Sequence, residues 1–253
     1  MSAPDTPMTT PEVSSATPSL ATPDTFLLDG RPIPFTPGQT LMQAAQAAGV
    51  YIPHLCHHAD FDPIGSCKVC SVRIQGRTVA SCTMPARAGL VVESETPELH
   101  HDRQRLTQML FVEGNHHCPF CEKSGACHLQ AVAYHLDMQD THFVHTAPHH
   151  EVDATHPDVW LDRSRCILCE LCVRASREVD GKDVFAIGGR GAHTTLLVNS
   201  PSGQLHDSDV AVTDRAVHIC PVGALMPKRQ GFVIPSGQRP YDAADIAQRP
   251  EDS

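Results

Sequence analysis

The placement of the cysteines constrains this chain more than any other feature. Its 253 residues include 11 cysteines. Iron–sulfur clusters are held by sets of four ligands, most of them cysteine thiolates. The cysteines form three groups: Cys56, Cys67, Cys70 and Cys82; Cys118, Cys121 and Cys127; and Cys166, Cys169, Cys172 and Cys220. Groups of four, three and four predict three clusters, with the twelfth ligand supplied by another residue type.

Disulfides are the main alternative use for so many cysteines. The number is odd, the third group contains two C-x-x-C steps in tandem, and no signal peptide is visible, so an oxidised secreted protein is disfavoured. No apolar run approaches the ~18 residues of a membrane span. The formal net charge is −10, which argues against a nucleic-acid partner. We therefore expect a protein of the reducing cytoplasm, without a membrane span or bound nucleic acid.

The first cysteine group lies in a stretch, residues 25–100, that alternates strand and helix signals. Asp29-Gly30 and Gln75-Gly76 are typical hairpin turns between apolar runs. Between the two hairpins, Thr40 can cap a helix that Gly49 ends. We expect a small mixed sheet with this helix packed across it.

A longer helix follows this stretch. Thr96-Pro97 provides its start, and Gly114 its end. Apolar residues at helical spacing predict its buried face. They are Leu99, Leu106, Met109 and Leu110.

Composition and cysteine grouping set the remaining boundaries. The leader is rich in Pro, Thr and Ser, which predicts disorder, and the end of the chain is polar and poor in pattern. We expect this polar tail to dock on a partner or to stay loose. The predicted divisions are a leader (1–24), a first domain (25–100), a second (101–145), a third (146–230) and a tail (231–253), in an α+β chain.

The first group has the spacing C-x10-C-x2-C-x11-C. We expect Cys67 and Cys70 to grip one iron from a single loop, with Cys56 and Cys82 arriving from either side. The small side chains of Gly65 and Ser66 allow backbone N–H groups to approach the sulfurs. Hydrogen bonds from these groups tune the reduction potential of a cluster. Zinc is the alternative occupant. The wide first gap is unlike the paired knuckles of zinc ribbons.

The second group, Cys118, Cys121 and Cys127, needs a fourth ligand, and two histidines precede it. His117 adjoins Cys118 and would struggle to reach a different iron of the same cube. His116 has the better reach. A neutral imidazole in place of a thiolate removes about one negative charge, so it should raise the cluster's potential. The alternative is a three-cysteine cluster with both histidines at the surface.

The third group follows the ligand logic of bacterial ferredoxins, a C-x2-C-x2-C run completed by a remote Cys-Pro pair. In those ferredoxins, equivalent steps supply a second cluster. Here all four positions for that second cluster lack cysteine: Ser176, Val210, Thr213 and Ala216. Their joint loss predicts a two-cluster scaffold that keeps one cubane.

Other cofactor and catalytic signatures are missing from the sequence. No G-x-G-x-x-G motif opens a helix, and there is no Walker A sequence. No Ser/His/Asp arrangement stands out. We expect a chain that carries electrons between sites on other polypeptides.

Four segments carry a family resemblance: residues 56–82, 113–130, 160–167 and 219–223. In their motifs and order, the chain resembles the small diaphorase (gamma) subunit of NAD-reducing soluble [NiFe] hydrogenases. It is also similar to the N-terminal part of the large iron–sulfur subunit of respiratory complex I. The resemblance covers roughly residues 25–240.

The resemblance implies three domains and a set of partners. They are a β-grasp [2Fe–2S] domain, a small His/Cys3 [4Fe–4S] domain that includes His116, and a ferredoxin-like [4Fe–4S] domain. A flavoprotein diaphorase subunit would hold FMN and the NAD(H) site, and [NiFe] hydrogenase small and large subunits would complete a hetero-oligomer that converts H2 and NAD+ to NADH and H+. The implied electron order runs from the first cysteine group to the third and then to the second.

Two other functions compete with this reading. The same chain of electron-transfer clusters could serve a complex I-type NADH dehydrogenase or an NAD-dependent formate dehydrogenase. Those versions usually continue into a long molybdopterin-type domain, whereas this sequence stops at Ser253. The single residue between His116 and Cys118 also favours the hydrogenase branch. A zinc scaffold or an iron–sulfur sensor is the third possibility, and the acidic charge without a helix-turn-helix signal speaks against a sensor.

Overall fold

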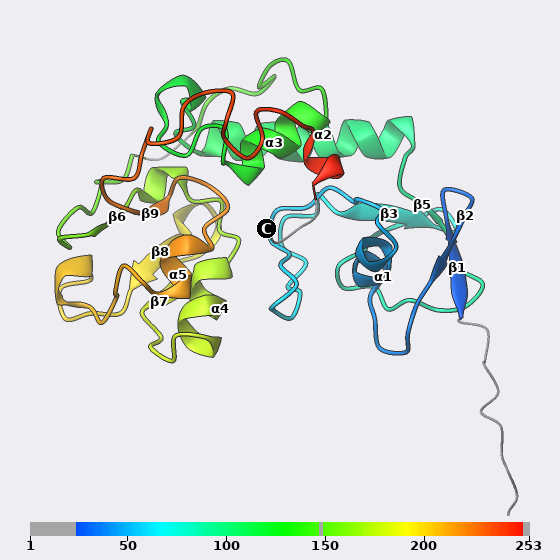
Figure 1. The fold of residues 1–253 in the computed structure, drawn as a ribbon, viewed down its shortest axis with the longest axis horizontal. Helices are drawn as coiled ribbons and strands as arrows, with labels where there is room; N and C mark the ends of the chain where they lie inside the picture. The colour runs from blue at the N-terminus through cyan, green and yellow to red at the C-terminus, as the bar shows by residue number, and fades with distance from the viewer. Residues whose placement is uncertain (1–23, 147–148, 250–253) are drawn as a thin grey trace, which may run out of the picture.

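The computed structural model describes residues 24–146 and 149–249 (Figure 1). The leader expected at residues 1–24 lies, apart from Asp24, outside the described residues. No described helix combines the length and the hydrophobicity that a bilayer span needs.

The first part is a five-stranded sheet with one short helix across it. Both predicted hairpins form, and each turn places two residues in the left-handed region: Asp29 with Gly30, and Gln75 with Gly76. That conformation matches the twist of a two-residue hairpin. The elements are β1 (Thr25–Leu28), β2 (Arg31–Pro34), α1 (Leu41–Ala47), β3 (Ser71–Ile74), β4 (Arg77–Ala80) and β5 (Val91–Glu93).

Strand order in this sheet is β2-β1-β5-β3-β4, with β5 parallel to β1 and antiparallel to β3. Thr40 caps α1 as expected, in a reciprocal capping box with Gln43. The helix buries Leu41 and Met42 against Phe26 and Ile33 of the first hairpin. This core is separate from the one that holds the rest of the molecule together.

The predicted long helix is α2 (Pro97–Glu113), but its predicted apolar face is partly wrong. Leu99 is fully buried, whereas Met109 is 42% exposed. Arg103 takes a core position at 1% exposure, because its Nη2 donates to the Ser71 carbonyl and to Ser94 Oγ, both at 2.9 Å. Acceptors at the ends of β3 and β5 therefore allow a charged side chain to fasten α2 to the sheet.

The remaining elements surround a second core. In Figure 1, α2 and α3 lie along the top, between the sheet on the right and the third part on the left. The second core joins α3 to the third part, with Leu129 and Val132 packed in the same cluster as Leu161 and Phe185. The helices and strands are α3 (His128–His135), β6 (Val159–Leu161), α4 (Leu171–Glu178), β7 (Phe185–Gly188), β8 (Thr195–Val198), α5 (Arg215–His218) and β9 (Leu225–Pro227).

Short 3-10 turns link these elements, and two strand pairs complete the fold. Strand β6 pairs antiparallel with β9, and β7 pairs antiparallel with β8. The α+β class predicted from the sequence is confirmed. The turns are η1 (Cys118–Phe120), η2 (Arg163–Arg165), η3 (Gly191–His193), η4 (Leu205–Asp207) and η5 (Ile246–Gln248).

The end of the chain differs from the predicted polar tail. Its described part folds back onto the second part of the molecule, where it lies beside α3 (Figure 1). The Tyr241 amide donates to the Gly125 carbonyl at 2.8 Å, and His135 pairs with Asp245 at 2.9 Å. Ile246 is 5% exposed and belongs to the second core. Tyr241 also packs against this core, but two such residues five positions apart produce no periodic signal, so the sequence did not reveal this packing.

Candidate metal centres

The four cysteines of the first group, called here the first ligand set, form two close pairs. The Sγ atoms of Cys70 and Cys82 are 3.4 Å apart, and the Cys67 amide donates to Cys56 Sγ at 3.4 Å. Cys56 and Cys67 also interact through their side chains. A disulfide needs sulfurs about 2.05 Å apart, and the cysteines are free.

We expected Cys67 and Cys70 to share one iron, but the structure places each of them next to another cysteine of the set instead. The β3–β4 hairpin explains the difference, because its register pairs Ser71 with Ala80. Cys70 precedes β3 and Cys82 follows β4, so they meet just beyond the end of the ladder. Hairpin pairing therefore overrides closeness in sequence.

Hydrogen bonds differentiate the two thiols of each pair. The pKa of Cys56 falls to about 6 because of a hydrogen bond from the Cys67 side chain, helped by the Cys67 and Ser66 amides, although burial opposes the fall. The same interaction and burial raise the pKa of Cys67. The pKa of Cys70 falls to about 6 through Cys82. Hydrogen bonds from the neighbouring thiols therefore favour one thiolate in each pair, the form that binds metal. At Cys56 the backbone donors add to this effect, and the small residues before Cys67 led us to expect such donors.

The second ligand set lines one cavity, and the histidine that joins it is His116. The cavity is bounded by Cys118, Cys121, Cys127 and His116, together with apolar residues of α2 and α3. His117 does not line the cavity and is exposed. The positions of the two histidines agree with our choice of His116 over His117. That His116 is a ligand stays a prediction.

The environment of His116 suits a metal ligand. Its Nε2 is buried and has no hydrogen-bond partner among the described residues. Burial, followed by the nearby Arg165, lowers the pKa of His116 to about 4, so the ring is neutral, as ligation requires. The ring lies directly against Gly114, where any side chain would collide with it. Gly114 thus ends α2 and leaves room for the imidazole.

Arg165 is a residue of this centre that sequence reasoning missed. Its Nη1 lies 3.7 Å from Cys121 Sγ and donates to Glu122 at 2.8 Å. Its Nε pairs with Asp162 at 2.9 Å, and its guanidinium lies 5.0 Å from the centre of the Trp160 ring. Carboxylates and an aromatic face hold one positive charge beside a thiol. The only sequence signal was the arginine just before Cys166.

The third ligand set also lines one cavity. Cys166, Cys169, Cys172 and Cys220 surround it, with apolar residues such as Leu196 between them. In the loop that bears the first two cysteines, residues 168 and 170 adopt the left-handed backbone conformation. Burial raises the pKa of Cys166 to about 11, and it raises the pKa values of Cys169 and Cys172 well above their usual range. Metal loading at this site must therefore displace protons.

Three of the four positions at which a second ferredoxin cluster would need cysteine are buried. Ser176 is buried and its Oγ accepts from the Val184 amide at 2.8 Å. Val210 and Ala216 belong to the second core, and Thr213 is exposed. Buried side chains therefore occupy three of the four positions, and the loss of a second cluster stays a prediction.

The three sets contain the donor atoms that iron–sulfur clusters use. Among residues 24–146 and 149–249, no three His, Cys, Asp or Glu side chains are placed to hold a single metal ion. The second and third sets instead face into cavities. Four cysteines, three cysteines with a histidine, and four cysteines are donor sets that fit iron–sulfur clusters.

Contacts connect the third set with each of the other two. Arg174 Nη2 donates to the carbonyls of Cys56, at 2.9 Å, and Cys169, at 3.3 Å. The first set therefore adjoins the third. A Cβ at Gly223, three residues after Cys220, would be 3.1 Å from Cys121 Sγ, so the third set adjoins the second.

Three family models match the chain in the order of these sites. A 2Fe-2S iron-sulfur cluster binding domain matches residues 21–97, and an NADH-ubiquinone oxidoreductase-G iron-sulfur binding region matches residues 103–142. A 4Fe-4S single cluster domain matches residues 159–226. The chain therefore contains 2Fe-2S and 4Fe-4S binding domains. The last of these models describes a single 4Fe-4S cluster, and the loss of a second cubane from the third part stays a prediction.

Similar proteins decide the family. The gamma subunit of the NAD-reducing hydrogenase HoxS from Cupriavidus necator is 40% identical over 223 residues, which are 88% of this chain and 94% of that protein. This chain belongs to the gamma-subunit family of NAD-reducing hydrogenases. A chain in a crystal structure of an NAD+-reducing [NiFe]-hydrogenase in the H2-reduced state is 54% identical, with a TM-score of 0.85, and the match covers 87% of this chain and 93% of that one.

The gamma-subunit family shares its domains with a larger protein. One subunit of the NADH-quinone oxidoreductase from Rickettsia prowazekii is 32% identical over 209 residues. These are 82% of this chain and 30% of that protein. The resemblance to the complex I subunit is therefore confirmed as a family relationship. The chain spans less than a third of the length of that relative.

Proposed function

We propose that this chain relays electrons between a flavoprotein subunit that binds FMN and NAD(H) and a [NiFe] hydrogenase module. It is the electron-transfer subunit of an oxidoreductase and has no catalytic residues of its own. The observation that carries the proposal is the gathering of eleven cysteines and one histidine at three adjoining centres. Cofactors at these centres would each take up and release single electrons.

The proposal assigns one [2Fe–2S] cluster and two [4Fe–4S] clusters to the chain. The first ligand set would hold the [2Fe–2S] cluster, because its thiols stand in two close pairs, one pair for each iron. The second and third sets would each hold a [4Fe–4S] cluster in the cavity that their side chains line. His116 completes the second set.

The protein would supply charge, hydrogen bonds and water exclusion around these centres. The amides of Ser66 and Cys67 favour negative sulfur in the first set. Arg165 places a positive charge beside the second set, and apolar side chains enclose the third. The contacts through Arg174 and Gly223 support the order first, third, second. Free cysteines support a cytoplasmic location.

The competing function is the same relay in a complex I-type NADH dehydrogenase or a formate dehydrogenase. The similarity to the NADH-quinone oxidoreductase protein favours this alternative as a relative. Against it, the hydrogenase gamma subunit matches at higher identity and over nearly its whole length.

The identity of the copurifying subunits distinguishes the two functions. The chain should be tagged in its native host and purified without oxygen, and its partners identified by mass spectrometry. We expect a flavoprotein and a nickel-containing subunit, with NAD+ reduction driven by H2. Copurification with quinone-module or formate-oxidising subunits, without H2-dependent activity, would assign the alternative function.

A further inference from the structure

The loop between Cys121 and Cys127 of the second ligand set consists of two overlapping turns. The amides of Ser124 and Ala126 donate to the carbonyls three residues earlier in the chain, at 3.0 and 2.9 Å. Gly125 lies between these two donors and adopts the left-handed conformation, with φ at 73°. The course of the backbone at Gly125 therefore sets how the two cysteines are placed relative to each other.

The side chain of Gln130, on α3, reaches back to this loop. Its Oε1 accepts from the Gly125 amide at 2.8 Å. Its Nε2 donates to Ser124 Oγ at 3.4 Å and to Tyr134 Oη at 3.2 Å. Gln130 is 8% exposed and lines the cavity of the second ligand set. An amide buried this deeply needs its hydrogen bonds, because unpaired polar groups are costly away from water.

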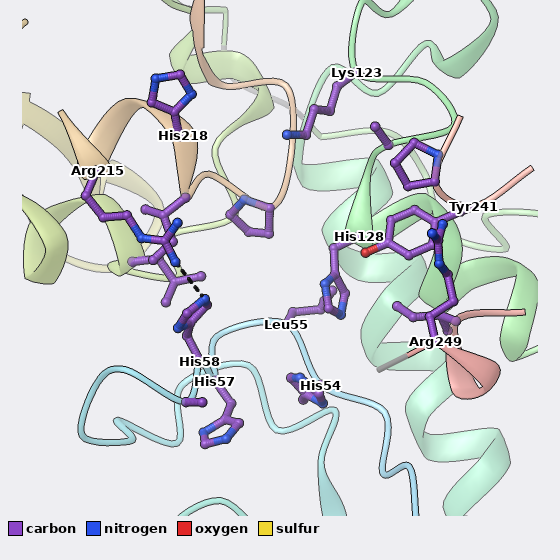
Figure 2. Close-up of a pocket in the computed structure, with 17 residues that line it drawn as sticks. His54, Leu55, His57, His58, Lys123, His128, Arg215, His218, Tyr241 and Arg249 are labelled. Carbon is purple, nitrogen blue, oxygen red and sulfur yellow. Dashed lines mark hydrogen bonds between the residues drawn. The ribbon is translucent and has the colours of Figure 1, made fainter. Parts of the chain in front are cut away.

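The carbonyl of Gly125 is bonded on the other side, to the chain end. It accepts from the Tyr241 amide at 2.8 Å. Figure 2 shows Tyr241 beside His128, the first residue of α3, and the centres of the two rings are 6.2 Å apart. Both the amide and the carbonyl of Gly125 are therefore bonded to groups outside the loop, and Gln130 supplies the acceptor for the amide.

We propose that Gln130 is a positioning residue, which fixes the loop between Cys121 and Cys127 so that the second ligand set closes around its cluster. The inference rests on the proposed function, because it requires a cluster in this set. The side chain of Gln130 acts through Gly125, two residues before Cys127. The backbone amide of Gln130 also donates to Cys127, which lowers the pKa of that thiol against the effect of burial. Substitutions retain this backbone contact, so they test the side chain alone.

The test uses Gln130→Met, which removes the side-chain hydrogen bonds at similar volume. The full chain is purified with its clusters without oxygen, and EPR of the reduced protein is recorded during timed exposure to air. Cys118→Ser identifies the signal of the second cluster. In Gln130→Met this signal should change its line shape and decay about tenfold faster, as expected when a buried amide is left unpaired. The other two clusters serve as internal references and should decay as before.

Gln130→Glu is the rescue variant. Its carboxyl group still accepts from the Gly125 amide, and the hydroxyl groups of Ser124 and Tyr134 can donate to it. The second cluster should therefore keep the line shape and the decay rate of the unmodified chain.

Gln108→Met is the matched control. Gln108 is 7% exposed, and its Nε2 donates to the carbonyl of Asp140 at 3.0 Å and to its side chain at 3.2 Å, outside the cavity of the second set. This variant should leave the second cluster unchanged. Equal decay in Gln130→Met and Gln108→Met, or no recovery in Gln130→Glu, would overturn the inference alone. An unmodified chain with about six irons and no cluster in the second set would contradict the proposed function as well.

Discussion

His116 and His117 are neighbours in sequence with opposite surroundings. The half-buried His116 lines the cavity of the second ligand set, whereas His117 is exposed outside it. We expect His116→Cys to keep a cubane with a lower reduction potential, because a thiolate adds negative charge. Redox titration followed by EPR measures the change.

His117→Ala is the control for this substitution. It should leave both the EPR signal and the potential of that cluster nearly unchanged. If His117→Ala removes the signal while His116→Ala does not, the assignment of the two histidines is reversed.

Arg165 provides a test of electrostatics at the same centre. Arg165→Gln removes a positive charge 3.7 Å from Cys121 Sγ, so the potential of the second cluster should fall. Stability should drop by about 1–3 kcal/mol, because Glu122 and Asp162 lose their shared partner. Arg165→Lys keeps the charge and should retain most of the potential. Equal potentials in all three proteins would show that this charge has no effect on the cluster.

At the scale of elements, the β3–β4 hairpin shows what sequence reasoning could reach. The turn at Gln75-Gly76 predicted the hairpin correctly. The pairing of Cys70 with Cys82 depends on strand register, which the spacing of cysteines does not encode. Sequence reasoning therefore selected these four cysteines as candidate ligands and missed how their side chains pair in space.

Polar contacts between segments that are distant in the sequence could not be predicted either. Arg103 of α2 can be buried because it donates hydrogen bonds to Ser71 and Ser94. An analysis of apolar periodicity misses such a residue, because it assigns every arginine to the surface. Arg165 stands beside Cys121, 44 positions earlier in the chain. The two residues of such a hydrogen-bonded pair are far apart in the sequence, so no local sequence pattern predicts the contact.

The chain end supplies a prediction at the scale of elements. Truncation after Gln230 removes the Tyr241 contact to Gly125 and the Asp245 contact to His135. Because Gly125 lies between Cys121 and Cys127, and the helix that bears His135 begins directly after Cys127, the second cluster should be lost faster in air than the other two. EPR during timed exposure follows each loss. Truncation after Arg249 keeps these contacts and should behave like the full chain; equal loss rates in both truncations would contradict this role of the chain end.

At the scale of the whole molecule, Arg174 joins the first part to the third. It donates to the carbonyls of Cys56, Asp62 and Cys169 and is 8% exposed. Arg174→Met should lower stability by about 2–4 kcal/mol, because buried carbonyls lose a charged donor. Denaturant unfolding without oxygen measures this loss.

The same helix offers the control. Arg177 is also on α4, but its side chain is 63% exposed and pairs with an exposed carboxylate. Arg177→Met should change stability by less than about 1 kcal/mol. Similar losses for the two variants would mean that Arg174 does not hold the parts together.

The central claim is that twelve residues hold three clusters of two kinds. Iron, acid-labile sulfide and zinc should be quantified in protein purified without oxygen, with Mössbauer spectra of the 57Fe-labelled protein. The account predicts about ten irons and about ten sulfides per chain, divided between one [2Fe–2S] and two [4Fe–4S] spectra. About six of each, or zinc without sulfide, would contradict it.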